Sequence, residues 1–241
     1  MMNKVLITND DGIKSYGLHL LKNILQKFAV EVYVVSPKDN MSGASRSISL
    51  KKDINYSKIS PYTWTVDGTP TDCIIFAMNY LFKEIKPDYI FSGINAGTNI
   101  GDEISYSGTV GAAFEGAIRG VPSLAISQKV LKNDIKEYAI IKKKLSIILP
   151  EVLGYFTDKN LLLNLNFPLC NLMNVKELKV VKCANQKVSD EIYINQEKSS
   201  FKIGKMNIIK TNSQDDLSAL DNGFITLTSI TTNLSKVNFY D

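Results

Sequence analysis

The stretch VLITNDDG, residues 5–12, decides the fold. Its apolar first half predicts a buried strand; an amphipathic helix pattern follows at residues 16–28 and a second strand pattern at residues 30–35. A strand, a helix and a strand in this order form a βαβ unit, which requires a parallel sheet. The adjacent carboxylates Asp10 and Asp11 therefore fall at the carboxyl end of a strand, where open α/β sheets bind ligands.

The adjacent aspartates Asp10 and Asp11 fit two interpretations, a metal site and a surface turn. Two ionised carboxylates in one place repel each other, so a divalent cation or a proton would stabilise the pair. However, Asp-Gly is also a common turn dipeptide, and acidic side chains suit the start of any helix. The stretch alone is equally compatible with a metal site and with an ordinary surface turn, so the other loops have to distinguish them.

The alternation of strand and helix patterns continues to residue 168. Further strands are predicted at residues 87–92, 123–127 and 161–167, and further helices at 70–83, 110–119 and 133–154, the last broken near Pro150. Thr69-Pro70-Thr71-Asp72 is typical of a helix start, with a threonine cap, proline in the first turn and an acidic residue placed for a capping box. Residues 48–54 and 62–66 interrupt the alternation as a hairpin-like excursion.

Beyond Pro168 the alternation stops. Strand-like segments without a convincing helix are found at residues 178–183, 191–194, 201–203 and 224–230. We therefore predict an α/β fold with a Rossmann-like, three-layer, parallel-sheet core at residues 1–168. Residues 169–241 are predicted to form a β-rich extension used in subunit contacts.

Composition and charge exclude several classes of protein. The chain has 241 residues and a formal net charge of +4, but its cations are mostly lysines spread along the sequence, which argues against binding a nucleic-acid polymer. The three cysteines show no Cys-x-x-Cys spacing and are expected to be reduced core residues. Without a recognisable leader or a long apolar run, we expect a cytoplasmic protein with no membrane contact.

Three loops that follow predicted strands converge on one edge of the sheet. They are residues 9–12, 36–47 and 93–107. Together they offer two carboxylates, several hydroxyls and side-chain amides, which are oxygen ligands of the kind that Mg²⁺ or Mn²⁺ prefers. Backbone amides of Gly43, Gly108 and Thr109, the last two at a helix start, could bind an anion. A metal beside an anion site indicates phosphate chemistry, such as phosphomonoester hydrolysis.

Each loop taken singly also fits an ordinary connection, because Gly- and Ser-rich loops are common in α/β proteins. Other phosphotransfer designs lack their residues. His19 is the only histidine and is expected to be a partly exposed helix residue, no cysteine is followed by Arg at the spacing of a cysteine phosphatase, and no P-loop motif occurs.

The motifs and their order resemble the SurE family of survival proteins, metal-dependent 5′(3′)-nucleotidases. The matching motifs are Asn9-Asp10-Asp11-Gly12, Ser42-Gly43-Ala44-Ser45, Gly68-Thr69-Pro70-Thr71-Asp72-Cys73, Ser92-Gly93-Ile94-Asn95-Ala96-Gly97 with Asn99, and Tyr106-Ser107-Gly108-Thr109-Val110. The resemblance is dense over residues 4–128 and returns at residues 163–168 and 216–234. It implies that one divalent ion per subunit is bound by Asp10, Asp11, Ser42 and Asn95. It also implies phosphate contacts from Asn99, Ser107 and Thr109, to which we add Asn9, Gly43 and Gly108.

The resemblance further implies a cytoplasmic enzyme that hydrolyses nucleoside 5′- and 3′-monophosphates, with some members trimming short polyphosphate, and that forms dimers or tetramers by exchanging the C-terminus. Residues 184–214 match no family pattern, and Thr228-Ser229 stands where the family usually has Thr-Pro, so the tetramer is less well supported. The catalytic nucleophile is either a water at the metal or one of Asp10 and Asp11. An alternative is a module that binds nucleotides or phosphorylated metabolites without turnover. A glycosyltransferase-like use of the two aspartates lacks a recognisable sugar-nucleotide loop.

Overall fold

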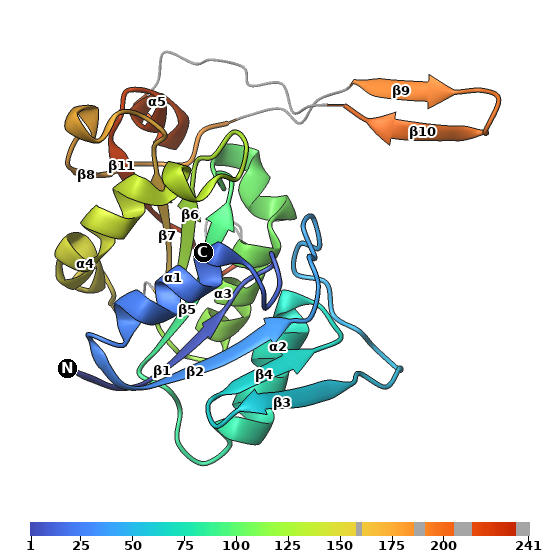
Figure 1. Ribbon diagram of the computed structural model, residues 1–241, viewed down its shortest axis with the longest axis vertical. Helices are drawn as coiled ribbons and strands as arrows, with labels where there is room; N and C mark the ends of the chain where they lie inside the picture. The colour runs from blue at the N-terminus through green and yellow to red at the C-terminus, as the bar shows by residue number, and fades with distance from the viewer. Residues whose placement is uncertain (158–160, 186–190, 205–213, 235–241) are drawn as a thin grey trace, which may run out of the picture.

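A nine-stranded, mostly parallel sheet carries the fold (Figure 1). The structure is a computed structural model and describes residues 1–157, 161–185, 191–204 and 214–234. The strands of the sheet lie in the order β3-β4-β2-β1-β5-β6-β7-β11-β8. Their bounds are β1 Met2–Thr8, β2 Ala29–Pro37, β3 Tyr56–Ser60, β4 Thr63–Val66, β5 Tyr89–Ala96, β6 Ser123–Gln128, β7 Leu162–Phe167, β8 Leu178–Val180 and β11 Ile225–Ser229. The predicted Rossmann-like α/β class is confirmed.

The order in which successive strands are placed in the sheet reverses at β1. Strands β2 and β4 follow on one side of β1, whereas β5, β6 and β7 follow on the other, and all of these neighbours are parallel. The loops after β1 and β5 therefore diverge from a topological switch point, where folds of this kind form their binding crevice. The stretch that includes Asp10 and Asp11 begins directly after β1.

Helices cover both faces of the sheet. They are α1 Tyr16–Leu25, α2 Pro70–Phe76, α3 Gly108–Ile118, α4 Ala139–Leu153 and α5 Asp216–Asp221. Alternate residues of β1 point to opposite faces: Val5 and Ile7 pack in one core cluster with residues of α1 and α4, and Leu6 packs in a second with residues of α2 and α3. The layers are therefore helix, sheet and helix.

Several predicted elements differ from the structure. The excursion is a hairpin, but its first strand is β3 at Tyr56–Ser60 and not residues 48–54. The helix that starts at Pro70 has the predicted capping box but continues after Phe76 as a π-helical turn, Ala77–Leu81. The helix of residues 133–154 is a 3₁₀ turn, Ile135–Tyr138, followed by α4, which includes Pro150 without a break, since Leu149 and Val152 on either side of it are buried in the core.

The chain beyond residue 168 contributes to the same sheet. Strand β11 pairs antiparallel with β7 and parallel with β8, and the short helix α5 precedes β11, so the expectation of no helix in this region is wrong. A 3₁₀ turn, Leu172–Asn174, lies between β7 and β8. The division into domains at residue 168 stays a prediction, but the sheet extends across it.

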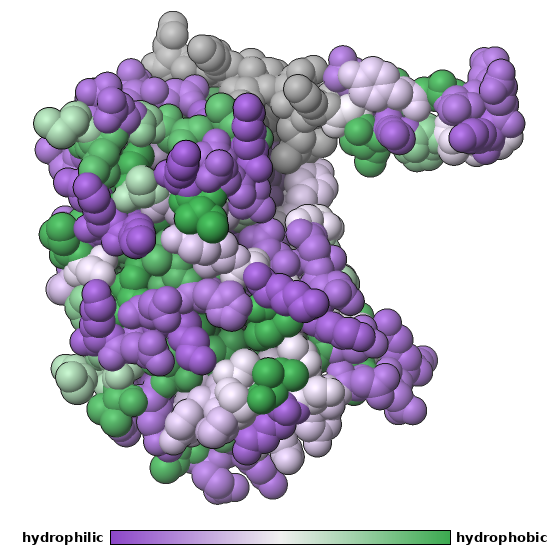
Figure 2. Space-filling view, viewed as in Figure 1, coloured by the Kyte–Doolittle hydropathy of each residue, from purple (hydrophilic) through white to green (hydrophobic). Residues whose placement is uncertain are grey.

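A separate antiparallel hairpin is formed by β9, Ile192–Asn195, and β10, Ser200–Ile203. Figure 1 draws it apart from the sheet, and Figure 2 shows apolar side chains on it exposed to solvent. The expected C-terminal exchange involves residues 235–241, which lie outside the described residues. In the part of the chain that the structure describes, no helix combines the length and apolar character needed to cross a bilayer.

Candidate active site

Asp10 is buried at the carboxyl end of β1 and contacts the start of α3. Its side chain is only 4% exposed, and its carboxylate accepts a hydrogen bond from the hydroxyl of Thr109. The first residue of α3, Gly108, packs directly on Asp10: a Cβ atom there would lie 3.0 Å from the Asp10 Cβ and 3.1 Å from the Pro70 Cγ. Only glycine permits this approach, so the backbone at the helix start lies against Asp10. Phosphate contacts by Gly108 and Thr109 stay a prediction.

Asp11 contacts the end of β5, on the other side of the switch point. Its Oδ2 accepts a hydrogen bond of 3.0 Å from the backbone N–H of Ala96. The preceding residue, Asn95, uses its side-chain Nδ2 to donate to the carbonyl of Gly97 at 3.1 Å, which leaves its Oδ1 without a partner among the described residues. Asp11, in the loop after β1, therefore lies beside Asn95 at the end of β5, although the two are far apart in sequence.

The loop after β2 is hydrogen-bonded to the backbone of Asp10. The N–H of Met41 donates to the backbone carbonyl of Asp10 at 2.7 Å, and the N–H of Ser42 donates to Oδ1 of Asn40 at 2.8 Å. Ser42 and Gly43 are exposed, and Gly43 adopts a left-handed conformation with φ +76°. Two of the four predicted metal ligands are Asp10 and Asp11 themselves. The other two are chain neighbours of residues bonded to them: Ser42 follows Met41, which is bonded to Asp10, and Asn95 precedes Ala96, which is bonded to Asp11.

Asn9 is buried completely and its side chain shapes the loop from within. Its Nδ2 donates to the carbonyl of Gly12 at 2.9 Å and to the Ser15 hydroxyl at 2.7 Å, and its Oδ1 accepts from the Ser36 hydroxyl at 2.6 Å. These three bonds fix the turn that presents the two aspartates. A phosphate contact by Asn9 stays a prediction.

Asn99 is held by a polar network that the sequence did not reveal. Its side-chain Nδ2 donates to the Ser127 hydroxyl at 2.8 Å. Its backbone is bound by Asn166, which accepts from the Asn99 N–H at 2.9 Å and donates to its carbonyl at 3.1 Å, and by Asn164, which donates to that carbonyl at 2.7 Å. The signal was present: two asparagines alternate with leucines in a buried strand, so both face the same side.

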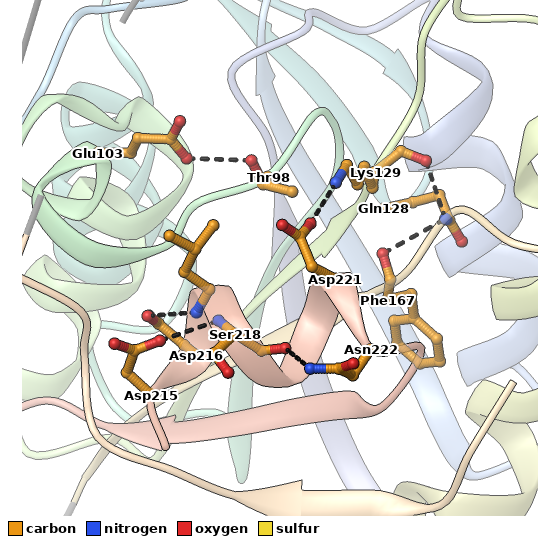
Figure 3. A network of polar contacts seen from close by, with 11 residues as sticks. Thr98, Glu103, Gln128, Lys129, Phe167, Asp215, Asp216, Ser218, Asp221 and Asn222 are labelled. Carbon is orange, nitrogen blue, oxygen red and sulfur yellow. Dashed lines mark hydrogen bonds and ion pairs between the residues drawn. The ribbon is translucent and has the colours of Figure 1, made fainter. Parts of the chain in front are cut away.

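Helix α5 contacts the loop that leads from Asn99 to Ser107 through Asp216. Figure 3 shows polar contacts of α5 together with the hydrogen bond between Thr98 and Glu103. Asp216 accepts hydrogen bonds from the backbone N–H groups of Gly101, Ala184 and Leu217, at 3.0, 2.7 and 2.9 Å. Within the loop, the Thr98 hydroxyl donates to Glu103 at 3.0 Å. The loop ends at Ser107, whose Oγ caps α3 by accepting from the N–H of Val110 at 3.0 Å.

The electrostatic environment of the two aspartates favours a positive partner. Burial, to which the charge of Asp11 adds, raises the pKa of Asp10 to about 6, although the Thr109 hydrogen bond favours the ionised form. Burial also raises the pKa of Asp11 against the opposing hydrogen bond from Ala96. None of the ion pairs among the described residues involves either carboxylate.

A hard divalent cation fits the available donor atoms. A carboxylate oxygen has more than one lone pair, so Asp10 and Asp11 can bind a cation beside the hydrogen bonds that they accept. The Oδ1 of Asn95 and the Oγ of Ser42 have no hydrogen-bond partner among the described residues. Clusters of three or more His, Cys, Asp or Glu side chains do not occur among the described residues, so soft-metal coordination has no basis there. The set of oxygens suits Mg²⁺ or Mn²⁺.

The fold and the site define a Rossmann-like α/β protein with paired carboxylates and a helix start at its switch point. The chain belongs to the SurE family: the sequence model of "Survival protein SurE" matches residues 5–190. The resemblance inferred from the motifs is thereby confirmed.

Relatives and a solved structure agree with this assignment. A protein named "5'-nucleotidase SurE" from Wolbachia sp. subsp. Drosophila simulans (strain wRi) is 35% identical over 246 residues, covering 98% of this chain and 91% of the relative. One of the same name from Wolbachia pipientis subsp. Culex pipiens (strain wPip) is 45% identical over 172 residues, 68% and 64% of the two chains. The crystal structure of the SurE protein from Aquifex aeolicus superimposes with a TM-score of 0.85 at 32% identity, over 98% of this chain and 96% of that one.

Proposed function

We propose that this protein is a phosphoric monoester hydrolase that converts nucleoside 5′- and 3′-monophosphates into nucleoside and phosphate, with short polyphosphate as an additional substrate. The curated relatives that it matches are named 5′-nucleotidases. The observation that carries the proposal is the contact between Asp10 and the first residues of α3. It brings a pair of carboxylates and the start of a helix, whose N–H end attracts anions, into one site.

In this proposal one Mg²⁺ or Mn²⁺ ion is held by Asp10, Asp11, Ser42 and Asn95. Such an ion polarises a phosphoryl oxygen and lowers the pKa of a bound water. Thr109 fixes the direction in which Asp10 presents its carboxylate, and Ala96 does the same for Asp11. The backbone amides of Gly108 and Thr109 stabilise the negative charge that builds up on the transferred phosphoryl group.

Subunit assembly belongs to the proposal as well: we expect a cytoplasmic homodimer or homotetramer. The support comes from the hairpin of β9 and β10. Ile192 pairs with Ile203, and Ile194 pairs with Phe201, so all four side chains share one face; each is at least 53% exposed. An isolated two-stranded hairpin is only marginally stable in water, and a second subunit would cover its apolar face.

The test is phosphate release from a panel of nucleoside 5′- and 3′-monophosphates and short polyphosphate, with Mg²⁺, with Mn²⁺ and with a chelator. We expect release that depends on either ion and stops with chelator. Tight nucleotide binding in calorimetry without release under any of these conditions would instead support a binding module without turnover. Release that is unaffected by chelator would exclude the metal.

A further inference from the structure

A cavity adjoins the phosphate end of the candidate site and has no role in the site described above. It has a volume of about 600 Å³, within the range of ~300–1,000 Å³ that is usual for small-molecule sites. Ser107, the residue that caps α3, lies on its wall. The cavity therefore begins beside the proposed phosphate site, since the next two residues along the chain are those that contact Asp10.

One face of α3 forms a wall of the cavity. Ser107, Val110, Gly111 and Phe114 line it, and these positions recur at the helical repeat, so they lie along a single stripe. Phe114 is seven residues from Ser107, about 10 Å along the helix axis. Ile104 and Ile230 add apolar surface beside Phe114. The end near the site is thus polar, and the far end is apolar and aromatic.

A second part of the wall is the loop that carries Arg46, which packs directly against α3. A Cβ atom at Gly111 would lie 2.5 Å from the carbonyl oxygen of Ser45, so only glycine lets this loop lie against α3. The backbone N–H of Ser45 donates to the carbonyl of Tyr106 at 3.1 Å, and its hydroxyl donates to the carbonyl of Ser105 at 2.7 Å, which fixes the loop to the other side of the cavity.

Arg46 lies over the ring of Phe114. The centre of its guanidinium is 4.3 Å from the ring centroid, and Arg46 forms no ion pair among the described residues. A guanidinium and an aromatic ring are both flat surfaces on which nucleic-acid bases stack. Because Arg46 already lies on Phe114, a base at the far end of the cavity would stack on the outer face of the guanidinium, which the ring supports from behind. Stacking of this kind recognises a base without requiring a particular one.

We propose that this cavity is the nucleoside subsite, in which Phe114 and Arg46 hold the base while the phosphate lies at Asp10 and the start of α3. The inference rests on the proposed function and specifies which part of the chain recognises the leaving group. A smaller cavity of about 260 Å³, lined by Tyr56 and Phe76, includes none of the candidate site residues and serves as the comparison.

The test compares adenosine 5′-monophosphate with ribose 5-phosphate, which lacks only the base, in the full-length protein with Mn²⁺. Wild type should prefer the nucleotide in kcat/KM. Phe114→Ala and Arg46→Ala should each reduce that preference, by about tenfold for Phe114, which is the order of the loss when the stacking of a base is removed. Phe76→Ala, the same substitution in the other cavity, should keep the preference. Arg46 is exposed, so its replacement does not threaten the fold.

Calorimetry of adenosine binding gives a second readout that is independent of hydrolysis. Adenosine should bind wild type and Phe76→Ala with similar affinity, and bind Phe114→Ala about tenfold more weakly. An unchanged nucleotide preference in both cavity variants, or a loss of preference in Phe76→Ala alone, would overturn the subsite. Phe114-dependent adenosine binding without phosphate release from any substrate would uphold the subsite and overturn the proposed hydrolysis instead.

Discussion

Thr109 is the residue whose contact most directly shapes the candidate site. Its hydroxyl donates to the buried carboxylate of Asp10, and a hydrogen bond to a charged group is worth ~1.5–3 kcal/mol. Thr109→Val keeps the shape of the side chain and removes the donor, so we expect kcat to fall by about 10- to 100-fold. Thr109→Ser, which restores a hydroxyl, should recover most of the activity. Equal activities of the Val and Ser variants would contradict this role.

Two asparagines of β7 are not equivalent, although they contact the same residue. Asn166 both accepts from and donates to the backbone of Asn99, whereas Asn164 only donates to its carbonyl. Asn166→Leu would leave a buried N–H without a partner, which costs about 1–3 kcal/mol. After Asn164→Leu the carbonyl keeps the bond from Asn166. Urea denaturation should therefore show the larger loss of stability for Asn166→Leu, and the reverse order would refute the assignment.

At the scale of elements, α5 gives the stability a defined pH dependence through Asp216. Burial raises the pKa of this carboxyl, against the hydrogen bonds from three backbone N–H groups. In the unfolded chain an aspartate titrates at about 3.9. Because the folded state holds its proton to higher pH, the contribution of Asp216 to the free energy of unfolding is greatest below that pH and declines as pH rises through the folded-state pKa.

Asp216→Asn removes this titration, so its free energy of unfolding should decline less than that of wild type between pH 4 and the folded-state pKa of Asp216. Above that pKa the variant should also lose hydrogen bonding, because an amide presents one acceptor oxygen to the three N–H donors where the ionised carboxylate presents two. Urea denaturation at a series of pH values measures both effects. A wild-type curve that runs parallel to that of the variant would show that Asp216 does not titrate in this range.

The elements that the sequence predicts well are those with a strong local signal. Strand β1 is predicted from the apolar run Val5-Leu6-Ile7, and the start of α2 is predicted from the cap at Thr69-Pro70. In contrast, α5 has only six residues, too few to show a helical repeat, and its cap Asp215 looks like a turn residue in sequence. The misplaced β3 has a similar cause: Ile48 and Leu50 are apolar, but they are exposed and pair with no strand.

The site was predictable from the sequence only in part. Asp10 and Asp11 stand out because they follow a buried strand. The clamp that Asn164 and Asn166 form on Asn99 joins residues more than 60 positions apart, and it depends on the register between β7 and the loop after β5. The contact of Asp11 with the Ala96 amide is likewise a product of strand order. The alternation of the two asparagines in β7 is visible in the sequence, but the residue that they contact is not, because it depends on long-range pairing.

At the scale of the whole molecule, the apolar face of the hairpin predicts assembly. Ile194→Lys with Phe201→Lys places two charges on that face and should lower the mass of the particle in light scattering. Tyr193→Lys puts a charge on the opposite face, since neighbouring residues of a strand point to opposite sides, and should leave the mass unchanged. An unaltered mass in the double variant would show that the hairpin does not hold subunits together.

The central claim is that Asp10 and Asp11 hold a catalytic divalent ion. Its most direct test measures Mn²⁺ binding by calorimetry and phosphate release from a nucleoside monophosphate in Asp10→Asn, Asp11→Asn and Asp88→Asn. Asp88 is an exposed aspartate. It contacts the backbone of Asn3 and Lys4 at the other end of the strands from Asp10 and Asp11, so it is a matched control. The account predicts that the first two variants lose Mn²⁺ affinity and turnover by orders of magnitude while the control keeps both. Near-normal turnover in Asp10→Asn and Asp11→Asn with Mn²⁺ present would contradict it.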